Sequence, residues 1–591
     1  MSFTILLIIF AFAIFVVATL LFRWLGEVEQ KTGKMSRPNL LFSILCVFLG
    51  IFFILSIYYA ILGQRTIIWF FVFVLIGILS LYIAGFSTPN FRRLSIIVIL
   101  VLAVVQSSMP ILQNRGIIFG PDQWRDLKIT TYIIEKGTFK DYPWLEPGFY
   151  SFIPLFNILN AAVSEILGCP AMVTIGILPV FFCLLSVLSI YAILKKLTGN
   201  VLISLIAVMI FLSTPRLAIV QAVPSTASIS LGILLFFLFI KGAVSFSRNF
   251  MSPIALLAFT IAVMHPIGVF IVLIISSGTL LLNHVYAKER LNPRIITFVK
   301  GVFAFCLFIP LAYWSSAKEV FAGVFKPLTK FLLSLTKFEK APSIYTPQYQ
   351  SAGFEIFSFA WALPVAFSAA YILTTFVTGW RKGSRLSQIT LRQVIDVCGL
   401  AGLLLILSAF ASVMVDPGAS VERYVNVIGY SLLILTASFV FGQFLFSKKK
   451  IVIFFAVLLL SANIVIGSSS PDWAPFENPA FGAIRYTFTS FIEANTMVNF
   501  LPNNIHLYED HDIPLSSVGS MKNITLITYR SYQPTRAIIQ IFKDNSFTPF
   551  DPRYHDTVLV IKNDEIIDQN LLYNYVNILY NSGKHIAVDP L

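Results

Sequence analysis

The sequence has few charged residues and few cysteines, and each shortage excludes a class of protein. Only 12% of the 591 residues are charged and 57% are hydrophobic, whereas soluble domains average about 25% charged residues. This composition excludes a soluble globular protein and indicates a polytopic membrane protein. The five cysteines are scattered and form no CxxC pair, so neither a disulfide framework nor a metal pair of that kind is available.

Three further absences narrow the class. Residues 4–22 are apolar with no small-residue cleavage site before Arg23, so we expect an uncleaved membrane helix rather than a signal peptide. The net charge of +14 does not come from one basic domain, because Lys and Arg form small clusters between apolar runs. That pattern is typical of cytoplasmic loops and not of a nucleic-acid-binding surface. An internal repeat is also missing, which weighs mildly against transporters built from duplicated halves.

Apolar runs of spanning length predict about 14 transmembrane helices. We place them at residues 4–22, 40–62, 66–86, 94–112, 171–194, 201–214, 222–240, 252–264, 266–283, 295–314, 356–378, 394–415, 421–446 and 451–467. A further run, residues 151–167, is interrupted by polar residues such as Asn160 and Glu165. We expect this segment to lie in the membrane interface.

The positive-inside tendency supports that placement of residues 151–167. If the segment does not cross, all basic clusters lie on one side of the membrane; if it crosses, those before and after it fall on opposite sides. The first arrangement places both chain ends and the loops 113–170 and 315–355 outside the cytoplasm. The clusters are Arg23/Lys31/Lys34/Arg37, Arg92/Arg93, Lys195/Lys196, Lys241/Arg248, Lys288/Arg290/Arg294, Arg381/Lys382/Arg385/Arg392 and Lys448/Lys449/Lys450.

The chain divides into three predicted parts. Residues 1–93 are additional N-terminal transmembrane helices, residues 94–467 are the main transmembrane module, and residues 468–591 are an extracytoplasmic soluble domain after a Ser-Ser-Ser-Pro linker. The predicted fold class is therefore an all-α polytopic membrane protein with a small C-terminal α/β domain.

Within the C-terminal part, the pattern of apolar residues predicts both strands and a helix. The runs at residues 523–528 and 557–561 predict strands, and residues 571–580 predict a helix. These elements together indicate a small α/β domain from residue 501 onward.

The first outer loop contains a charged stretch, Gly-Pro-Asp-Gln-Trp-Arg-Asp at residues 120–126. Proline suits the first turn of a helix, so Asp122 is expected near a helix start, with Asp126 one turn later on the same face. Two such carboxylates could accept a proton from a hydroxyl nucleophile, or hold a divalent cation such as Mg²⁺ or Mn²⁺ against a phosphate. The alternative is that acids in a first turn merely complement the helix dipole.

Short motifs follow this stretch: Glu-Lys-Gly-Thr-Phe at 135–139, Tyr-Pro at 142–143, and Lys-Lys-Leu-Thr-Gly at 195–199. Together with the acidic residue of the outer loop they resemble the GT-C membrane glycosyltransferases, over residues 94–467. These include the oligosaccharyltransferases, protein O-mannosyltransferases and aminoarabinose transferases. The resemblance implies inverting transfer of a sugar from a polyprenyl-phosphate carrier at the outer face. It also implies that Asp122 is the catalytic base or a metal ligand, with Asp126 as the second candidate.

Three more outer-face residues fit the implied donor site. Arg423 opens the last long span and resembles the family's late-helix arginine, whose guanidinium pairs bidentately with phosphate oxygens. Its alternative role is that of an interfacial arginine paired with Glu422. His265, at an outer turn, and Arg216, in an outer loop, are further candidates for contact with the carrier phosphate. For His265 the alternative is a helix-end cap.

The Trp-Trp-Asp-Tyr-Gly sequence of oligosaccharyltransferases is absent, which argues against en bloc oligosaccharide transfer and for a monosaccharide donor. The predicted partners are a polyprenyl-phosphate-linked sugar and membrane lipid; the acceptor stays open, and nucleic acid is excluded. A transporter or flippase of lipid-linked or amphiphilic substrates is the main alternative, and a membrane scaffold is the third. Transporters usually place ionisable groups near the bilayer midplane, but the predicted spans contain few apart from Asp396.

Overall fold

A computed structural model describes much of the helical part of the chain and the strands of a C-terminal sheet. The described residues are 38–62, 67–113, 121–139, 153–212, 223–245, 247–285, 293–316, 365, 368–372, 391–415, 421–445, 457–458, 460–461, 506–508, 525–526, 557–562, 576–581 and 585–590. The predicted span at 4–22, the loop 315–355 beyond residue 316, and most of the predicted spans at 356–378 and 451–467 lie outside these residues.

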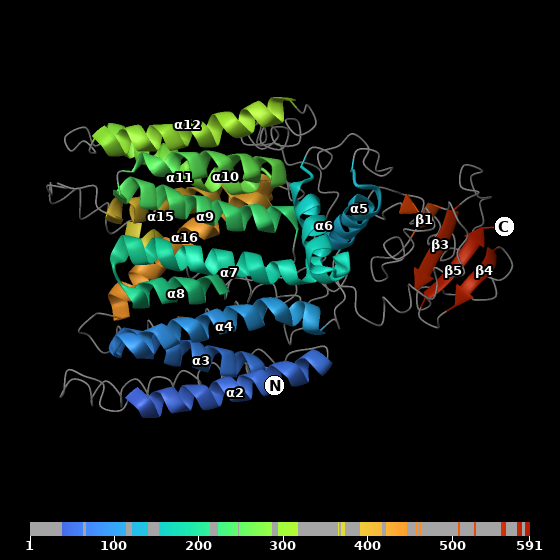
Figure 1. The fold of residues 1–591 in the computed structure, drawn as a ribbon, viewed down its shortest axis with the longest axis horizontal. Helices are drawn as coiled ribbons and strands as arrows, with labels where there is room; N and C mark the ends of the chain where they lie inside the picture. Colours follow the sequence, from blue (N-terminus) through green and yellow to red (C-terminus); the bar gives the residue numbers. More distant parts are fainter. Residues whose placement is uncertain are drawn as a thin grey trace.

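The described helices form one bundle (Figure 1). They are α2 (Pro38–Leu62), α3 (Ile67–Phe86), α4 (Pro89–Gln113), α7 (Ala171–Thr198), α8 (Val201–Leu212), α9 (Pro224–Ser245), α10 (Met251–Met264), α11 (Ile267–Val285), α12 (Pro293–Ser316), α15 (Leu391–Val415) and α16 (Val421–Leu445), with a 3-10 turn η2 (Arg248–Phe250) before α10. Each lies at a span predicted from the sequence. Six helices in the described part are long and apolar enough to cross a membrane. The bundle is that of an all-α integral membrane protein.

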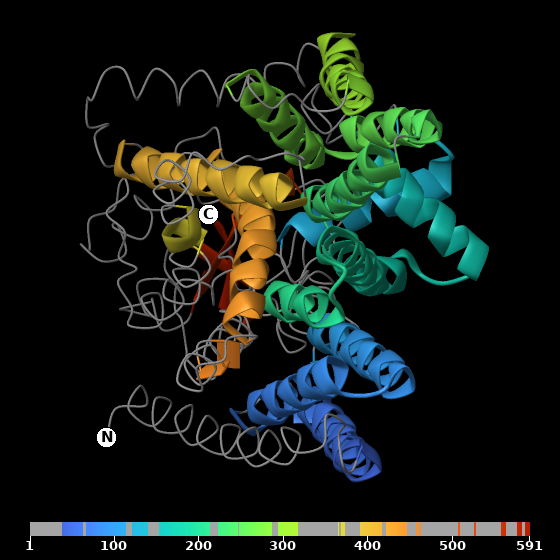
Figure 2. The ribbon, with the colours of Figure 1, turned by 90° about the vertical axis from the view of Figure 1, so that its left-hand side faces the viewer.

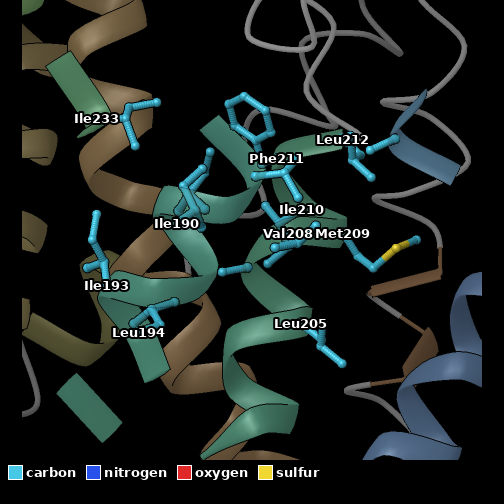
Figure 3. Close-up of a cluster of buried hydrophobic side chains, with 14 of the residues drawn as sticks. Ile190, Ile193, Leu194, Leu205, Val208, Met209, Ile210, Phe211, Leu212 and Ile233 are labelled. Atoms are coloured by element: carbon cyan, nitrogen blue, oxygen red, sulfur yellow. The ribbon is translucent and has the colours of Figure 1, made fainter. Parts of the chain in front are cut away.

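Helix α8 lies at the centre of this bundle because it is apolar on every side. All twelve of its residues are buried, as expected for a helix without a polar face, and it packs against α3, α4, α7 and α16. Figure 3 shows its side chains together with those of α7 and α9, among them Ile190 and Ile233. By contrast, α2 leaves Ile54 69% and Ile57 63% exposed, which suits a face that contacts lipid. Figure 2 shows α2, α3 and α4 on one flank of the bundle and α10, α11 and α12 on another.

Helices α9 and α11 approach so closely that their backbones touch. A Cβ atom added to Gly268 would lie 1.9 Å from the backbone oxygen of Ser228, and one added to Gly232 would lie 2.4 Å from that of Gly268. Small residues allow this approach in membrane proteins, where close packing helps drive helix association. The neighbouring pair α7 and α9 is joined by a hydrogen bond from the Ser186 hydroxyl to the Ser230 hydroxyl, 2.9 Å long.

The basic-Leu-x-Gly motif at residues 195–199 forms the corner between α7 and α8. Gly199 adopts a left-handed conformation (φ 67°) and its N–H donates to the Lys195 carbonyl, which is a common way to end a helix. The Lys195 ammonium in turn donates to the Gly199 carbonyl at 2.7 Å. Asn200 then caps α8, because its side-chain oxygen accepts from the Leu202 N–H at 2.8 Å. The motif therefore has a structural role at the basic end of the bundle.

Two short helices, α5 (Pro121–Lys136) and α6 (Leu155–Leu167), lie across one end of the bundle and not alongside its helices (Figure 1). Helix α6 has 13 residues. Its orientation across the end of the bundle agrees with the interfacial position predicted for residues 151–167. Left-handed glycines end both helices, Gly137 (φ 65°) and Gly168 (φ 61°). The Ser164 hydroxyl donates to the Cys169 carbonyl and closes the corner between α6 and α7.

The C-terminal strands form one five-stranded sheet, beyond α5 and α6 in Figure 1. Its order is β2-β1-β3-β5-β4, with β1 parallel to β2 and β3, and β5 antiparallel to β3 and β4. The strands are β1 (His506–Tyr508), β2 (Thr525–Leu526), β3 (Thr557–Lys562), β4 (Val576–Asn581) and β5 (His585–Pro590).

The sheet confirms two predicted strands and corrects one predicted helix. Strand β2 lies within residues 523–528 and β3 covers residues 557–561, as expected. The helix predicted at residues 571–580 is wrong over its second half, which is strand β4. The physical reason is its pairing: β4 and β5 form an antiparallel ladder, and this contact overrides local preference. Helices of the predicted α/β domain lie outside the described residues.

Candidate functional site

Helix α5 carries the two predicted acids at its first two turns. It begins at Pro121, so Asp122 is its second residue and Asp126 follows one turn later, as the sequence predicted. The side chain of Asp126 is fully buried, and Gln123 and Thr130 are buried with it. These positions are three and four residues apart, so they form one face of the helix. Asp122 lies one turn before Asp126 on this helix, and its side chain lies outside the described part.

Helix α6 turns a second polar face toward the protein interior. Asn157, Asn160 and Ser164 are buried at helical spacing, whereas Ile166 is 82% exposed. The two helices pack against each other, and the Thr130 hydroxyl donates to the Asn157 side-chain oxygen at 3.4 Å. We name the buried polar residues of both helices the α5–α6 polar layer. Its members are Gln123, Asp126, Thr130, Asn157, Asn160 and Ser164.

The amides of this layer differ in how their hydrogen bonds are satisfied. Asn157 accepts from Thr130. Asn160 is also fully buried, but neither its side-chain oxygen nor its nitrogen has a hydrogen-bond partner within the described structure. Buried polar groups are almost always paired in folded proteins. The sequence indicated Asn160 only as an interruption of an apolar run, and its burial depends on contacts far along the chain.

His265 follows α10 directly and connects it to α11. Its N–H donates to the Ile261 carbonyl at 2.8 Å, and its ring Nδ1 accepts from the Ile267 N–H at 3.4 Å. One ring nitrogen, Nδ1, therefore acts as the helix cap that the alternative predicted, here at the start of α11. With Nδ1 as an acceptor, the neutral ring carries its proton on Nε2. Nε2 is then the nitrogen able to donate to an anion.

The turn at His265 is fixed by a residue that sequence reasoning missed. The Ser228 hydroxyl, on α9, donates to the His265 carbonyl at 2.6 Å and accepts from the Gly268 N–H at 2.9 Å. The only sequence signal for this close helix contact was the small size of Ser228, Gly232 and Gly268. Such residues are frequent in membrane helices, so their presence did not single out this contact.

A small apolar cluster around Trp314 holds the start of α6 at the same end of the bundle as His265. Ile153, just before α6, packs with Ala262 of α10 and Trp314 of α12. The Trp314 indole N–H donates to the Ala262 carbonyl at 3.2 Å. Since His265 lies three residues after Ala262, it lies at the end of the bundle where α6 begins.

The direction of α16 places Arg423 at this end as well. Near the other end of α16, a Cβ atom on Gly442 would lie 2.3 Å from Cγ1 of Ile203, close to the α7–α8 corner with its lysines. About 28 Å of helix separates Gly442 from Arg423, so the start of α16 lies at the opposite end of the bundle. The Arg423 side chain lies outside the described residues, as does the whole of Arg216.

The structure thus brings the backbones of the α5 acids, His265 and Arg423 to one end of the bundle. Among the residues with described side chains, there is no group of three His, Cys, Asp or Glu that could hold a metal ion. To hold the predicted cation, Asp122 and Asp126 would need further oxygen ligands, such as those of substrate phosphate and water. Mg²⁺ accepts such a ligand set, because it commonly binds one or two carboxylates, phosphates and water.

This arrangement defines an integral membrane protein with a polar, acid-containing site at one end of its helix bundle. The sequence matches no protein-family model and no curated protein. Among solved structures, the fold is similar to that of an Archaeoglobus fulgidus oligosaccharyltransferase crystallised with a tethered acceptor peptide. The TM-score is 0.46 and the identity 12%, over 85% of this chain and 74% of that chain. Oligosaccharyltransferases are among the GT-C enzymes that the sequence motifs resemble.

Two crystal structures of ArnT from Cupriavidus metallidurans are also similar to this fold. The apo form has a TM-score of 0.38 and covers 84% of this chain, and the form bound to undecaprenyl phosphate has a TM-score of 0.39 and covers 85%. Both are 12% identical and match over 98% of ArnT.

Proposed function

We propose that this protein is a GT-C-type membrane glycosyltransferase that transfers a sugar, with inversion, from a polyprenyl-phosphate carrier to an acceptor at the extracytoplasmic face. The observation that carries the proposal is the buried carboxylate of Asp126 on a short helix across the end of the bundle, one turn after Asp122. Burying a carboxylate costs free energy unless its surroundings supply hydrogen bonds or positive charge. A buried carboxylate of this kind is therefore a candidate functional group.

In the proposed reaction, Asp122 takes the proton from the acceptor hydroxyl as its oxygen attacks the anomeric carbon. Asp126, one turn later on α5, is the second carboxylate of the site and the alternative base. Attack from the side opposite the phosphate inverts the anomeric centre, and the carrier phosphate leaves with the bonding electrons. The guanidinium of Arg423 and the Nε2–H of His265 stabilise the charge that develops on this phosphate. A divalent cation held by the two acids would supply further stabilisation of that charge when bound.

The charge distribution supports the proposed sidedness. Lys195 and Lys196 lie in the last turn of α7, at the basic corner, and α7 begins next to α6. Arg92 closes the corner between α3 and α4 at the basic end, because its Nε donates to the Ala84 carbonyl at 3.1 Å. Basic clusters mark cytoplasmic loops, so the α5–α6 end would face the opposite side.

The test uses purified protein in proteoliposomes that contain radiolabelled polyprenyl-phosphate mannose or polyprenyl-phosphate glucose. Wild-type protein is expected to release polyprenyl phosphate and to label a hydroxyl acceptor, whereas Asp122→Asn and Arg423→Gln should lose most of this turnover. Glu135→Gln is the matched control, because Glu135 is an exposed acid at the far end of the same helix. Full turnover by a correctly inserted Asp122→Asn variant would refute its role as base. Transport of the labelled lipid without a glycosylated product would instead favour the transporter alternative.

A further inference from the structure

The side chain of Asn160 stands out in the α5–α6 polar layer. It is fully buried, yet its amide oxygen and nitrogen both lack a hydrogen-bond partner among the described residues. Its neighbours on the same helix are satisfied, since Asn157 accepts from Thr130 and Ser164 donates to the Cys169 carbonyl. A buried amide without hydrogen bonds lowers the folding stability of the protein. A ligand that completes its hydrogen bonds would remove that cost.

We propose that the Asn160 amide binds neighbouring hydroxyl groups of a sugar ring, an inference that rests on the function proposed above. The amide offers an acceptor at its oxygen and donors at its nitrogen, side by side. An ionised phosphate offers only acceptors and would leave the Asn160 oxygen unpaired, and a lipid chain offers neither. Two adjacent hydroxyls can donate to the oxygen and accept from the nitrogen at once. The chemistry of the unsatisfied group therefore selects a sugar over the carrier.

The position of Asn160 relative to the acids supports this assignment. Asn160 lies one turn after Asn157 on the buried face of α6, and Asn157 contacts Thr130, which lies one turn after Asp126 on α5. The start of α6 is held near His265 by the cluster of Ile153, Ala262 and Trp314. A sugar bound by Asn160 is thus held on the helix adjacent to the acids. Because Asn160 has no exposed surface, the elements packed around it must move when the sugar enters.

The first arm of the test measures thermal stability without ligand. Asn160→Leu should raise the melting temperature, because a buried side chain of similar size replaces an unsatisfied amide. The matched control is Asn157→Leu, the same substitution one turn earlier on the same helix, with the same gain in helix propensity. It removes the partner of the Thr130 hydroxyl and should lower the melting temperature. A decrease in Asn160→Leu equal to that of Asn157→Leu would overturn the proposal, because it would assign Asn160 an ordinary structural role.

The second arm measures ligand-induced stabilisation of the full-length protein in detergent. The probes are bare polyprenyl phosphate, polyprenyl phosphate carrying mannose, glucose, galactose or N-acetylglucosamine, and the methyl glycosides of these sugars. Wild-type protein should be stabilised more by a sugar-bearing lipid than by the bare lipid. Asn160→Leu should keep its response to bare lipid but bind the sugar-bearing lipid about tenfold more weakly or worse. Loss of a methyl-glycoside response as well would assign the amide to an acceptor sugar, and loss confined to the lipid-linked probe would assign it to the donor.

A remote control tests whether any unsatisfied buried group behaves in this way. The Ser80 hydroxyl of α3 is buried and has no hydrogen-bond partner in the described structure. Ser80→Ala should raise the melting temperature and leave the sugar response unchanged. A sugar-dependent increment that survives in Asn160→Leu overturns the assignment to Asn160 alone. Absence of that increment in wild-type protein overturns the proposed function, and the sugar assignment with it.

Discussion

Buried polar residues in the helix bundle and in the α5–α6 polar layer are satisfied in different ways. In the bundle, many buried hydroxyl side chains bond to the carbonyl four residues earlier in their own helix, as Ser107 does to Ala103 at 2.7 Å and Thr279 does to Ile275 at 2.7 Å. A carboxylate cannot do this, because it can only accept and the N–H groups within a helix are already used. Hydroxyls with such bonds are therefore compatible with a structural role alone, whereas the Asp126 carboxylate needs side chains or other donors to satisfy it.

Substitution of Asp126 should have the largest effect of the four changes that test this difference. Asp126→Asn should reduce sugar transfer by about 100-fold or more, since a positioned carboxylate in acid–base chemistry is worth about that much. The measurement is the initial rate of transfer in proteoliposomes at equal amounts of inserted protein. The fold should persist, because a neutral amide of the same shape replaces a buried charge. A rate equal to that of wild type would show that the layer is structural, like the bundle.

Gly268 should give the next largest effect. Gly268→Ala brings a Cβ atom within 1.9 Å of the Ser228 backbone oxygen, and neither backbone can move without separating α9 from α11. We expect destabilisation of about 3 kcal/mol, at the upper end for overpacking. Denaturant unfolding in detergent would measure it. Gly50→Ala in α2 is the control, because nothing lies within 4 Å of a Cβ atom added there.

Ser228 tests a hydroxyl that bonds between helices. Ser228→Ala removes the acceptor of the Gly268 N–H and the donor to the His265 carbonyl. A buried N–H left unpaired should cost about 2 kcal/mol of unfolding free energy. Ser228→Thr keeps the hydroxyl but adds a methyl group, which must fit against α11. The stability that this variant recovers relative to Ser228→Ala would measure how tight the contact is. An unchanged stability in Ser228→Ala would contradict the role assigned to this residue.

The smallest effect is expected at a hydroxyl that bonds only within its own helix. Ser438 donates to the Ile434 carbonyl at 2.5 Å in α16. Ser438→Ala should change the unfolding free energy by less than about 0.5 kcal/mol, because the carbonyl keeps its backbone hydrogen bond and Ala favours the helix. A loss as large as that of Ser228→Ala would remove the distinction between bonds within a helix and bonds between helices.

The helical part of the fold could be predicted because length and apolar composition are local properties of a segment. The runs at 40–62 and 421–446 became α2 and α16 almost without change. The sheet was harder to predict. Strand β1 has three residues, and its neighbours β2 and β3 lie far along the chain. Strand β4 forms where residues 571–580 predicted a helix, because its pairing with β5 is a contact that local patterns do not weigh.

The candidate site was predictable to a similar extent. A proline and two acids at i and i+4 were enough to place Asp122 and Asp126 on one face of α5. The contacts of Ser228 and the burial of Asn160 were not predictable, because both depend on which helices become neighbours. Local spacing thus predicts which residues share a face, but not what that face packs against.

The corner between α6 and α7 also gives experimental access to the orientation of the protein. Cys169 lies at this corner and is partly exposed, whereas Cys183, Cys306 and Cys398 are buried and Cys46 lies on α2, whose exposed side is apolar. A maleimide that cannot cross membranes should therefore react with Cys169 from the aqueous phase next to the α5–α6 end. Labelling of intact cells would report the sidedness of that end through a natural thiol, without an added tag.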